Sequence, residues 1–335
     1  MRRPRSIQSL RRLIETIKKS RRILVSTHQL PDGDGLGAET ALYHYLRKAG
    51  KSVQICNPDP PPGRYKFLDP SGKILKSVGK KLPWNRFDCW IIVDTNDPRR
   101  LGKLWPELSV RAKKIVFLDH HVELSQNDSY PPHATCVADK TSSSIGELLD
   151  HVFTEWGAVK LDAKISLGLY VSVMTDTNSF RYARTTPAAH AIAARSIEQG
   201  VNPETIYQAI YSSKQVSHLK LLGRMLETLK VDGRGKIAWF EMPLSERKRF
   251  GASADDTQSF LNFLLLLKDA ELVCLFREED DRRIRVSIKS KGTIKVESVA
   301  SELGGGGHEY AAGLSLALSM RETVRTVVDR LTMLL

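Results

Sequence analysis

Three short apolar segments, each followed directly by acidic or histidine residues, constrain the fold of this chain more than any other feature. They cover residues 23–26, 89–93 and 115–118. Runs of four or five apolar residues bounded by polar ones are typical of strands that are buried on both faces of a parallel sheet. Because the carboxyl ends of parallel strands meet at one edge of the sheet, the residues that follow should lie together. The sequence therefore predicts an α/β fold with a site at that edge.

The residues at these positions are mainly aspartates and histidines. Four clusters stand out: His28-x-x-x-Asp32-Gly33-Asp34, Asp94-Thr95-Asn96-Asp97, Asp119-His120-His121 and Asp176-Thr177-Asn178, the last just beyond a helix predicted over residues 161–174. Carboxylates with neutral imidazoles are suitable ligands for a pair of divalent cations, which can activate water toward phosphorus. Gly33 and Gly35 would permit a tight turn, so that Asp32 and Asp34 point into one cavity. The pattern predicts a metal-dependent phosphoesterase.

Asp94 and Asp119 are expected to differ in role. Two-metal hydrolases hold their ions about 3.5–4 Å apart, which requires a bridging ligand, and Asp94 at the end of a central strand is our choice. Since Asp119 immediately precedes His120, the two side chains do not easily face one metal, and we expect Asp119 to orient an imidazole. Each cluster alone has an ordinary structural interpretation, because a strand-end aspartate can cap a helix. Their combination favours a metal site.

The rest of the chain predicts a second α/β region. Strands are predicted over residues 53–56, 236–241, 272–277 and 284–290, and helices over about 35–49, 144–155, 188–199, 217–230, 259–267, 296–303 and 321–334. A length of 335 residues favours two domains. We place the boundary between residues 200 and 230.

Charge and cysteine usage narrow the class of protein. The net charge of +13 favours a polyanionic partner, although a basic surface kept for solubility is the alternative. The four cysteines include no C-x-x-C pair, which is typical of reduced thiols in a cytoplasmic protein. No apolar run approaches the roughly 18 residues of a membrane span. Leu10, Leu13, Ile14 and Ile17 predict an amphipathic helix rather than a secretion signal.

The clusters resemble the motifs of a known superfamily. Asp119-His120-His121 resembles the signature of the DHH phosphoesterases, and the run from Gly304 to His308 resembles the motif of the DHH-associated domain. The segment Thr27-His28-Gln29-Leu30-Pro31-Asp32-Gly33-Asp34-Gly35-Leu36-Gly37 is similar to the first motif of the superfamily. The resemblance implies a two-lobed α/β protein. Residues 1–205 would form a parallel-sheet catalytic domain, 206–230 a linker helix, and 231–335 a smaller α/β substrate-binding domain.

The same resemblance implies roles for individual residues. His28 and Asp32 would hold one cation, Asp34, His120 and Asp176 would hold the other, and Asp94 would bridge the two. His121 would face the substrate phosphate, and Asp94, Asp119, His120 and His121 would form the catalytic set. The usual metal of the superfamily is manganese, so we expect two Mn²⁺ ions. Such a site is rich in oxygen ligands and has no thiolate. Magnesium and cobalt are the alternative metal ions.

The expected substrates are short oligoribonucleotides or nucleotides. The chain is most similar in size and domain pair to the bifunctional oligoribonucleases and phosphoadenosine phosphate phosphatases, called nanoRNases. These proteins imply that a hydroxide held between the cations releases 5′-mononucleotides from very short RNA, and converts 3′-phosphoadenosine 5′-phosphate to AMP. A linear or cyclic dinucleotide phosphodiesterase is an alternative, as is a nucleotide-binding regulator without turnover. We expect no membrane partner, and a homodimer stays open.

Several residues are expected to bind the substrate. Gly304 to Gly307 could present backbone N–H groups to an anion, with His308 beside them, and Gly305, Gly306 and Gly307 are our choices. Arg100, just after the bridging strand, is a candidate phosphate contact. Two positions depart from the nanoRNase pattern. Lys289 stands where an arginine is common and cannot grip phosphate with two parallel hydrogen bonds. Asn178 stands where glycine is commoner, so the sequence does not predict the conformation of the local turn.

Overall fold

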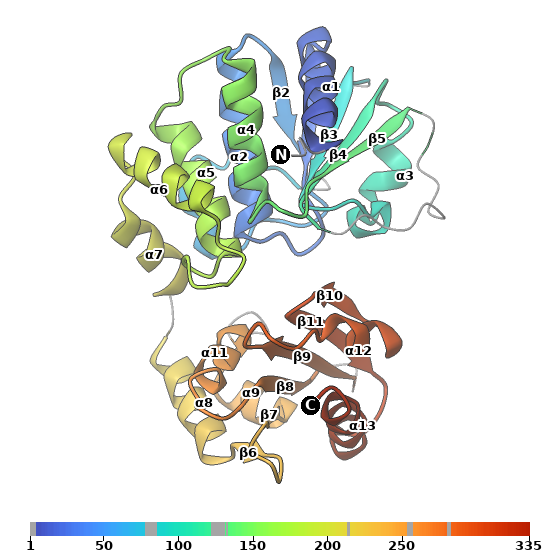
Figure 1. Ribbon diagram of the computed structural model, residues 1–335, viewed down its shortest axis with the longest axis vertical. Helices are drawn as coiled ribbons and strands as arrows, with labels where there is room; N and C mark the ends of the chain where they lie inside the picture. The colour runs from blue at the N-terminus through green and yellow to red at the C-terminus, as the bar shows by residue number, and fades with distance from the viewer. Residues whose placement is uncertain are drawn as a thin grey trace. The chain divides into compact units, whose positions relative to one another are not determined.

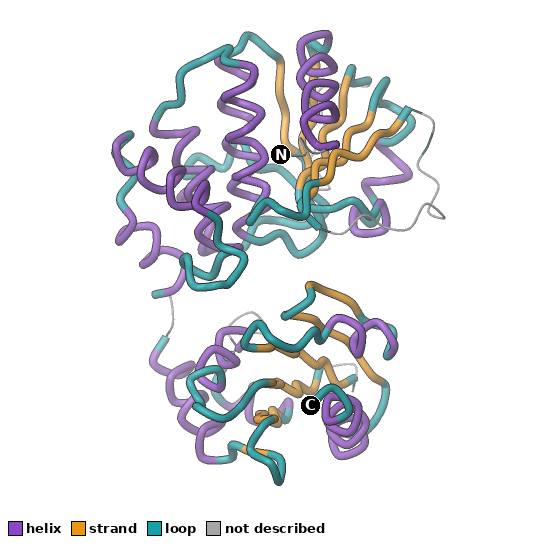
Figure 2. Tube along the Cα trace, in the orientation of Figure 1, coloured by secondary structure: helices purple, strands orange, loops and turns teal. Residues whose placement is uncertain are grey.

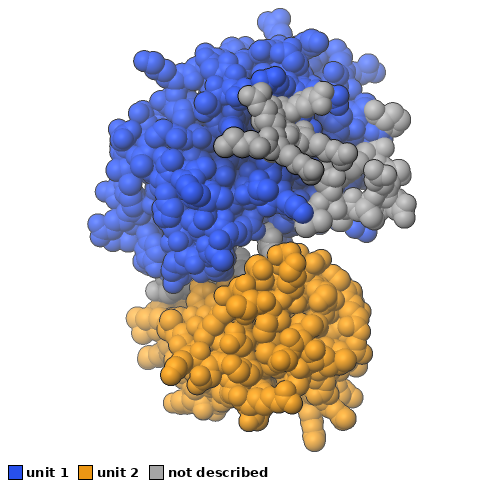
Figure 3. Space-filling model, in the orientation of Figure 1, with its two compact units in different colours: residues 1–213 blue, residues 214–335 orange. Residues whose placement is uncertain are grey.

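The computed structural model describes residues 5–77, 86–121, 131, 133–212, 215–252, 257–279 and 283–335 (Figures 1 and 2). The chain divides into two compact units, residues 1–213 and 214–335 (Figure 3). The predicted linker over residues 206–230 covers two separate helices, of which α7 (Pro203–Tyr211) lies in the first unit and α8 (Val216–Glu227) in the second.

The first unit contains a parallel sheet with helices on both faces. Its strands are β1 (Arg22–Ser26), β2 (Ser52–Ile55), β3 (Cys89–Val93), β4 (Ile115–Asp119) and β5 (Ala134–Ala138). Its α-helices are α1 (Arg5–Lys19), α2 (Gly33–Lys48), α3 (Leu104–Leu108), α4 (Ile145–Trp156), α5 (Ala163–Asp176), α6 (Pro187–Glu198) and α7, and its short 3₁₀ helices are η1 (Gly63–Leu68) and η2 (Pro98–Leu101). The strand order is β2-β1-β3-β4-β5, and every pair is parallel.

Alternate residues of the central strands enter two different cores. Ile91 and Val93 face the core that includes α1, α2, α4 and α5, whereas Trp90 and Ile92 face α3 and η2 (Figure 1). Because both faces are covered, the strands are apolar throughout, which is why their positions could be predicted. In this strand order β2 and β3 lie on opposite sides of β1. Ligands of open α/β sheets bind at such a point, beyond the carboxyl ends of the strands.

The second unit is built on a mixed sheet of order β10-β11-β9-β8-β7-β6. Its strands are β6 (Lys230–Val231), β7 (Ile237–Met242), β8 (Leu272–Glu278), β9 (Ile284–Ser290), β10 (Gly306–His308) and β11 (Ala311–Leu316). Its helices are α8, α9 (Leu244–Arg249), η3 (Gln258–Phe260), α11 (Leu261–Leu264), α12 (Glu297–Glu302) and α13 (Met320–Thr332). Helices α12 and α13 pack against one face of the sheet, and α8 and α11 pack against the other.

Three details differ from the sequence predictions. The helix predicted over residues 161–174 extends two residues further, so Asp176 is the last residue of α5 rather than a residue beyond it. Strand β5 was not predicted, because its alanines and cysteine are only partly buried and its threonine is exposed at the edge of the sheet. Strands β10 and β11 were not predicted either, since glycine is depleted in strands and this stretch contains Gly306, Gly307 and Gly313.

Candidate active site

The site lies at the carboxyl ends of β1, β3 and β4. His28 follows β1, Asp94 follows β3, and His120 follows Asp119 at the end of β4. Asp94 has a positive φ of 64°, which is uncommon for a residue with a side chain. Its N–H donates to the Leu118 carbonyl of β4 at 3.0 Å. Strain of this kind persists only where surrounding contacts fix it, and it is concentrated at functional sites.

The start of α2 brings two more carboxylates to this edge. Asp32 is the N-cap of α2, and its Oδ1 accepts hydrogen bonds from the N–H groups of Asp34 and Gly35 at 3.0 and 3.2 Å. A Cβ on Gly33 would lie 2.3 Å from Cγ2 of Thr175, and one on Gly35 would lie 2.2 Å from Oγ1 of Thr27. The glycines are therefore needed for close packing of the first helical turn, and the expected tight turn is replaced by a helix start.

Asp34 is held by two other helices. Both of its carboxylate oxygens lie 3.1 Å from the backbone N–H of Ile145 at the start of α4. The hydroxyl of Ser172 on α5 donates to Oδ1. The side chain is 2% exposed. Burial, and then the nearby charges of Asp94 and Asp176, raise the pKa of Asp34 well above its usual value. A carboxylate in this environment favours a positive partner.

Asp94 reaches two histidines with different oxygens. Its Oδ2 lies 3.3 Å from Nε2 of His28, and its Oδ1 lies 3.6 Å from Nε2 of His120. Although burial alone would raise the pKa of Asp94, hydrogen bonds from His120 and His28 hold it well below its usual value. The carboxylate is therefore charged and faces both halves of the site, as a bridging ligand would.

Three sets of side chains have ligand atoms within 4.8 Å of one another. Two of them are the ligand groups expected for one ion each: His28, Asp32 and Asp94, and then Asp34, His120 and Asp176. The third, Asp94, Asp119, His120 and His121, shares Asp94 and His120 with these two groups. Nε2 of His120 lies 3.3 Å from Oδ2 of Asp34 and 3.7 Å from Oδ2 of Asp176. The buried Oδ2 of Asp176 accepts no hydrogen bond among the described residues, although it forms an ion pair with Nη2 of Arg184 at 3.3 Å. Crowded carboxylates and imidazoles fit a pair of divalent cations.

Asp119 serves the histidines beside it. Its Oδ1 accepts hydrogen bonds from the N–H groups of His120 and His121 at 2.8 and 3.2 Å, and lies 2.6 Å from Nδ1 of His121. Burial raises the pKa of Asp119, but the hydrogen bond with His121 and the charges of the two histidines together outweigh burial and lower it. The imidazole that Asp119 orients is therefore that of His121. This contact fixes the orientation of the His121 ring.

Arg184 contacts this site but was not predicted from the sequence. Its Nη2 lies 3.3 Å from Oδ2 of Asp176, 2.5 Å from Nδ1 of His120 and 3.4 Å from the carbonyl oxygen of Ser142. Nothing in the sequence indicated this contact, because eight residues separate Arg184 from Asp176 without any periodic pattern. Tyr65 and Tyr211 were also missed, although they line a cavity of about 140 Å³ together with Asp32, Gly33, Asp34, Thr175 and Asp176.

The predicted substrate contacts are spread over both units. Arg100 is exposed in η2, and its carbonyl oxygen accepts the N–H of Gln29 at 2.7 Å. Lys289 lies on β9, where its Nζ donates to Oδ1 of Asn262 at 3.1 Å. The backbone of His308 lies in β10, and its side chain lies outside the described residues.

The glycine run was expected to present its backbone N–H groups to an anion. The N–H groups of Gly304 and Gly305 donate to the carbonyls of Ser301 and Ala300, which end α12. Gly306 and Gly307 belong to the edge strand β10, where a Cβ on Gly307 would lie 2.6 Å from the Ala311 carbonyl oxygen. The N–H of Gly305 is therefore not available to an anion.

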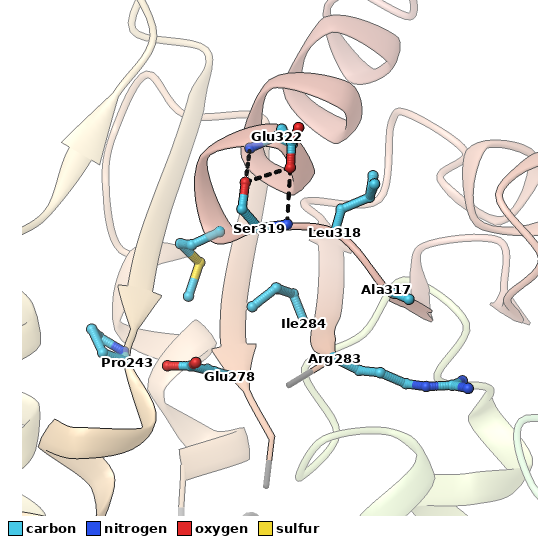
Figure 4. A pocket seen from close by; sticks show the side chains of 9 residues that line it. Pro243, Glu278, Arg283, Ile284, Ala317, Leu318, Ser319 and Glu322 are labelled. Carbon is cyan, nitrogen blue, oxygen red and sulfur yellow. Dashed lines mark hydrogen bonds between the residues drawn. The ribbon is translucent and has the colours of Figure 1, made fainter. Parts of the chain in front are cut away.

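A larger cavity of about 630 Å³ lies elsewhere in the second unit (Figure 4). Ile284 and Leu318 line it, beside Ser319 and Glu322, which cap the start of α13. Ile284 begins β9, whereas Lys289 lies near its other end. None of the predicted substrate contacts lines this cavity.

Comparison with protein families identifies both units. Residues 22–171 match the model of the DHH family, N-terminal domain, and residues 235–333 match the model of the DHHA1 domain. The two matches are separated by the segment that contains α6, α7 and α8. No α-helix in the described part of the chain is both long enough and apolar enough to cross a membrane.

Curated relatives carry the names of phosphoesterases. The chain is 26% identical over 316 residues to the bifunctional oligoribonuclease and PAP phosphatase NrnA of Thermus thermophilus, with 93% of this chain and 90% of that protein covered. The NrnA protein of Mycoplasma genitalium is 24% identical over 309 residues, with 91% and 92% covered. The cyclic-di-AMP phosphodiesterase GdpP of Bacillus subtilis is 23% identical over 338 residues, which cover 91% of this chain and 46% of that protein.

A solved structure has the same fold. An exopolyphosphatase-related protein from Bacteroides fragilis is similar to this chain with a TM-score of 0.85 and 22% identity, and the match covers 96% of this chain and 95% of the other. At this identity the likeness supports the fold alone.

Proposed function

Since this chain belongs to the DHH family of phosphoesterases and carries a DHHA1 domain, we propose that it hydrolyses very short oligoribonucleotides to 5′-mononucleotides and 3′-phosphoadenosine 5′-phosphate to AMP. The convergence of the two ligand groups at the carboxyl ends of β1, β3 and β4 carries this proposal. The net charge of +13 supports a polyanionic substrate, because a basic surface attracts phosphates. The names of the NrnA relatives support this choice of substrates.

Two divalent cations are the proposed cofactors, with Mn²⁺ as the first choice. We propose His28 and Asp32 as ligands of one ion, Asp34, His120 and Asp176 as ligands of the other, and Asp94 as a ligand of both. When bound, such ions supply positive charge at phosphorus and lower the pKa of a water molecule.

The remaining residues bind and orient the substrate in this proposal. Asp119 holds Nδ1 of His121 at 2.6 Å, so that Nε2 of His121 faces the phosphate and donates a hydrogen bond to it. Arg100 contacts the same phosphate or its neighbour, since it is exposed in η2. In the second unit, Lys289, His308 and the edge strand that contains Gly306 and Gly307 bind the rest of the nucleotide.

The proposal is tested with a set of substrates. The full chain is incubated with end-labelled RNA from the dinucleotide to about ten nucleotides. This range covers most of the numbers of nucleotides that a protein site for single-stranded nucleic acid contacts. Phosphoadenosine phosphate, cyclic-di-AMP and its linear form are assayed beside these, each with Mn²⁺ and with a chelator. We expect metal-dependent release of mononucleotides, fastest from the shortest RNA. Preference for cyclic-di-AMP over every linear RNA would favour the phosphodiesterase alternative.

A matched pair of variants tests the residues. Asp94→Asn should lose activity about a thousandfold or more, the scale expected when a main electrostatic group is removed. Asp97→Asn is the control, because Asp97 lies in the same segment but its Oδ1 caps η2 through the N–H of Arg99 at 2.9 Å. Equal activity of Asp94→Asn and the control would show that the bridging assignment is wrong. If the wild type binds nucleotides but does not hydrolyse them, the result would favour the alternative of a nucleotide-binding regulator.

A further inference from the structure

A strained turn follows Asp176. Asn178, Ser179 and Phe180 are three successive residues with positive φ, at 50°, 59° and 63°. Consecutive L-residues rarely adopt this left-handed conformation, because in it each Cβ crowds the following carbonyl oxygen. The N–H of Ser179 donates to the Met174 carbonyl at 2.7 Å, and the N–H of Phe180 donates to Oγ1 of Thr177 at 3.0 Å. These bonds reverse the chain at the end of α5, so that the residues after the turn return to the site.

The turn brings a cation against the second ligand group. Nη2 of Arg184 lies 3.3 Å from Oδ2 of Asp176 and 2.5 Å from Nδ1 of His120. The side chain of Arg184 is 32% exposed, whereas that of Asp176 is 18% exposed and that of His120 is fully buried. The guanidinium therefore covers two of the three residues of the group formed by Asp34, His120 and Asp176.

The contact with His120 fixes the position of a proton. A neutral imidazole has one N–H and one lone pair, and a guanidinium has no acceptor. Arg184 therefore uses the lone pair on Nδ1, which leaves the hydrogen on Nε2. Nε2 faces Oδ2 of Asp34 at 3.3 Å, where this hydrogen is directed toward the carboxylate. A metal bound by Nε2 needs the opposite tautomer, in which Nδ1 carries the hydrogen.

An acceptor for that second tautomer is already present. The carbonyl oxygen of Ser142 lies 3.4 Å from Nδ1 of His120 and 3.4 Å from Nη2 of Arg184. When Arg184 moves away, Nδ1–H can donate to this carbonyl while the lone pair of Nε2 becomes free. Where the ring is neutral before and after this change, one proton moves from Nε2 to Nδ1 through solvent, and none is gained or lost.

We propose that Arg184 competes with a divalent cation for the group formed by Asp34, His120 and Asp176. Its guanidinium acts there as an internal cation, and it leaves Nδ1 of His120 before Nε2 binds the metal. Arg184 is thus a positioning residue that lowers the affinity of this half of the site for its ion. This inference rests on the metal centre of the proposed function.

Calorimetric titration of Mn²⁺ into the metal-free full chain tests the inference. Arg184→Ala and Arg184→Gln should each bind one Mn²⁺ about tenfold more tightly than the wild type, because an opposite charge at this distance changes a carboxylate equilibrium by one to three pKa units. Arg181→Ala is the matched control. Arg181 carries the same charge on the same turn, and its Nε donates to the Asn178 carbonyl at 3.0 Å. The control should bind Mn²⁺ as the wild type does.

Nitrogen-15 NMR of the histidine rings provides a second measurement. In the metal-free wild type, His120 should carry its proton on Nε2, and after addition of diamagnetic Mg²⁺ the proton should be on Nδ1. A metal-free wild type that already carries the proton on Nδ1 would overturn the inference. A purely structural role for Arg184 would not predict this change of tautomer.

The outcomes separate this inference from the proposed function. If the wild type binds two Mn²⁺ ions while the Arg184 variants bind them equally tightly or more weakly, Arg184 does not compete with the ion. That result would still support the proposed metal centre. If Arg184→Ala changes only the KM for the nucleotide, Arg184 is a substrate contact instead. If neither the wild type nor any variant binds Mn²⁺, the metal centre fails, and the inference fails with it.

Discussion

One carboxylate serves two neighbouring histidines at the end of β4. Asp119 fixes the backbone of His120 and His121 and holds the ring of His121. An asparagine could keep the same acceptor oxygen in place, but it would remove the negative charge beside the imidazole of His121. The Asp119→Asn variant therefore removes the negative charge of this side chain while its hydrogen-bond acceptor stays in place.

We expect Asp119→Asn to lower turnover about 10- to 100-fold, the usual effect of losing a partner behind a functional histidine. The melting temperature should change little, since the hydrogen bonds can remain. Asp139→Asn is the control: Asp139 follows the neighbouring strand β5, and its Oδ1 accepts the N–H of Thr141 at 3.0 Å. Steady-state kinetics of both variants provide the measurement. Wild-type turnover in Asp119→Asn would mean that the negative charge has no role.

At the residue scale, the sequence predicted the acids and histidines because they follow recognisable strands. It did not predict Arg184, whose contact depends on three positive φ angles in the preceding turn. The departure at Asn178 is now explained, since asparagine enters the left-handed region more readily than most residues. Neither serine nor phenylalanine favours a positive φ, so the sequence did not predict that the chain after Phe180 turns back and brings Arg184 to the site.

At the scale of elements, the site depends on two helices that approach very closely. A Cβ on Gly37 of α2 would lie 2.5 Å from the Gly168 carbonyl oxygen, and a Cβ on Gly168 of α5 would lie 2.5 Å from the Gly37 carbonyl oxygen. One turn after Gly168, Ser172 donates its hydroxyl to Asp34. The close crossing therefore sets the distance between a candidate ligand and its hydrogen-bond partner.

Gly168→Ala should lower the free energy of unfolding by about 1–3 kcal/mol, as overpacking of a core does. Gly223→Ala is the matched control, because Gly223 lies in α8 and has no atom within 4 Å of its Cβ position. It should raise stability by about 0.5–1 kcal/mol, the difference in helix preference between the two residues. Urea denaturation followed by circular dichroism measures both. A Gly168→Ala protein as stable as wild type would show that α2 and α5 can separate at no cost.

The elements that could be predicted are those with a strong apolar pattern. The central strands β1, β3 and β4, and the helix start at Ser144, whose Oγ accepts the N–H of Glu147 at 3.2 Å, were confirmed. Strand β10 was missed for a physical reason: its glycines have no side chains that would show a period. Glycine is required at Gly307, because β10 and β11 approach too closely there for a Cβ.

At the scale of the whole molecule, the site concentrates negative charge inside a chain of net charge +13. The pKa of Asp34 is raised from 3.8 by burial and by neighbouring carboxylates. Burial lowers the pKa values of His28 and His120, but nearby aspartates outweigh it and raise both above 6.5. In each case the metal-free folded state binds protons more tightly than the unfolded state. Its stability therefore falls as pH rises through the raised values.

The chelated protein should thus lose stability as the pH rises above the unfolded pKa values, 3.8 for Asp34 and 6.5 for His28 and His120, and through the raised ones. The lowered pKa values of Asp94 and Asp119 act below pH 3.8, outside this pH range. Added Mn²⁺ should reverse the trend, because metals bind the deprotonated forms. Melting temperatures across pH, with chelator and with Mn²⁺, provide the measurement. The chelated Asp34→Asn protein should show a flatter profile, and an unchanged slope would contradict the assignment to Asp34.

The cap at the start of α2 limits how Asp32 can coordinate an ion. Its Oδ1 already accepts two backbone N–H groups, from Asp34 and Gly35, so Oδ2 is the oxygen left for a cation. Asp32 would therefore be a monodentate ligand, since chelation through both oxygens would break the cap. Mn²⁺ prefers six oxygen or nitrogen donors, and a single-oxygen ligand leaves coordination positions that solvent or a phosphate oxygen can fill.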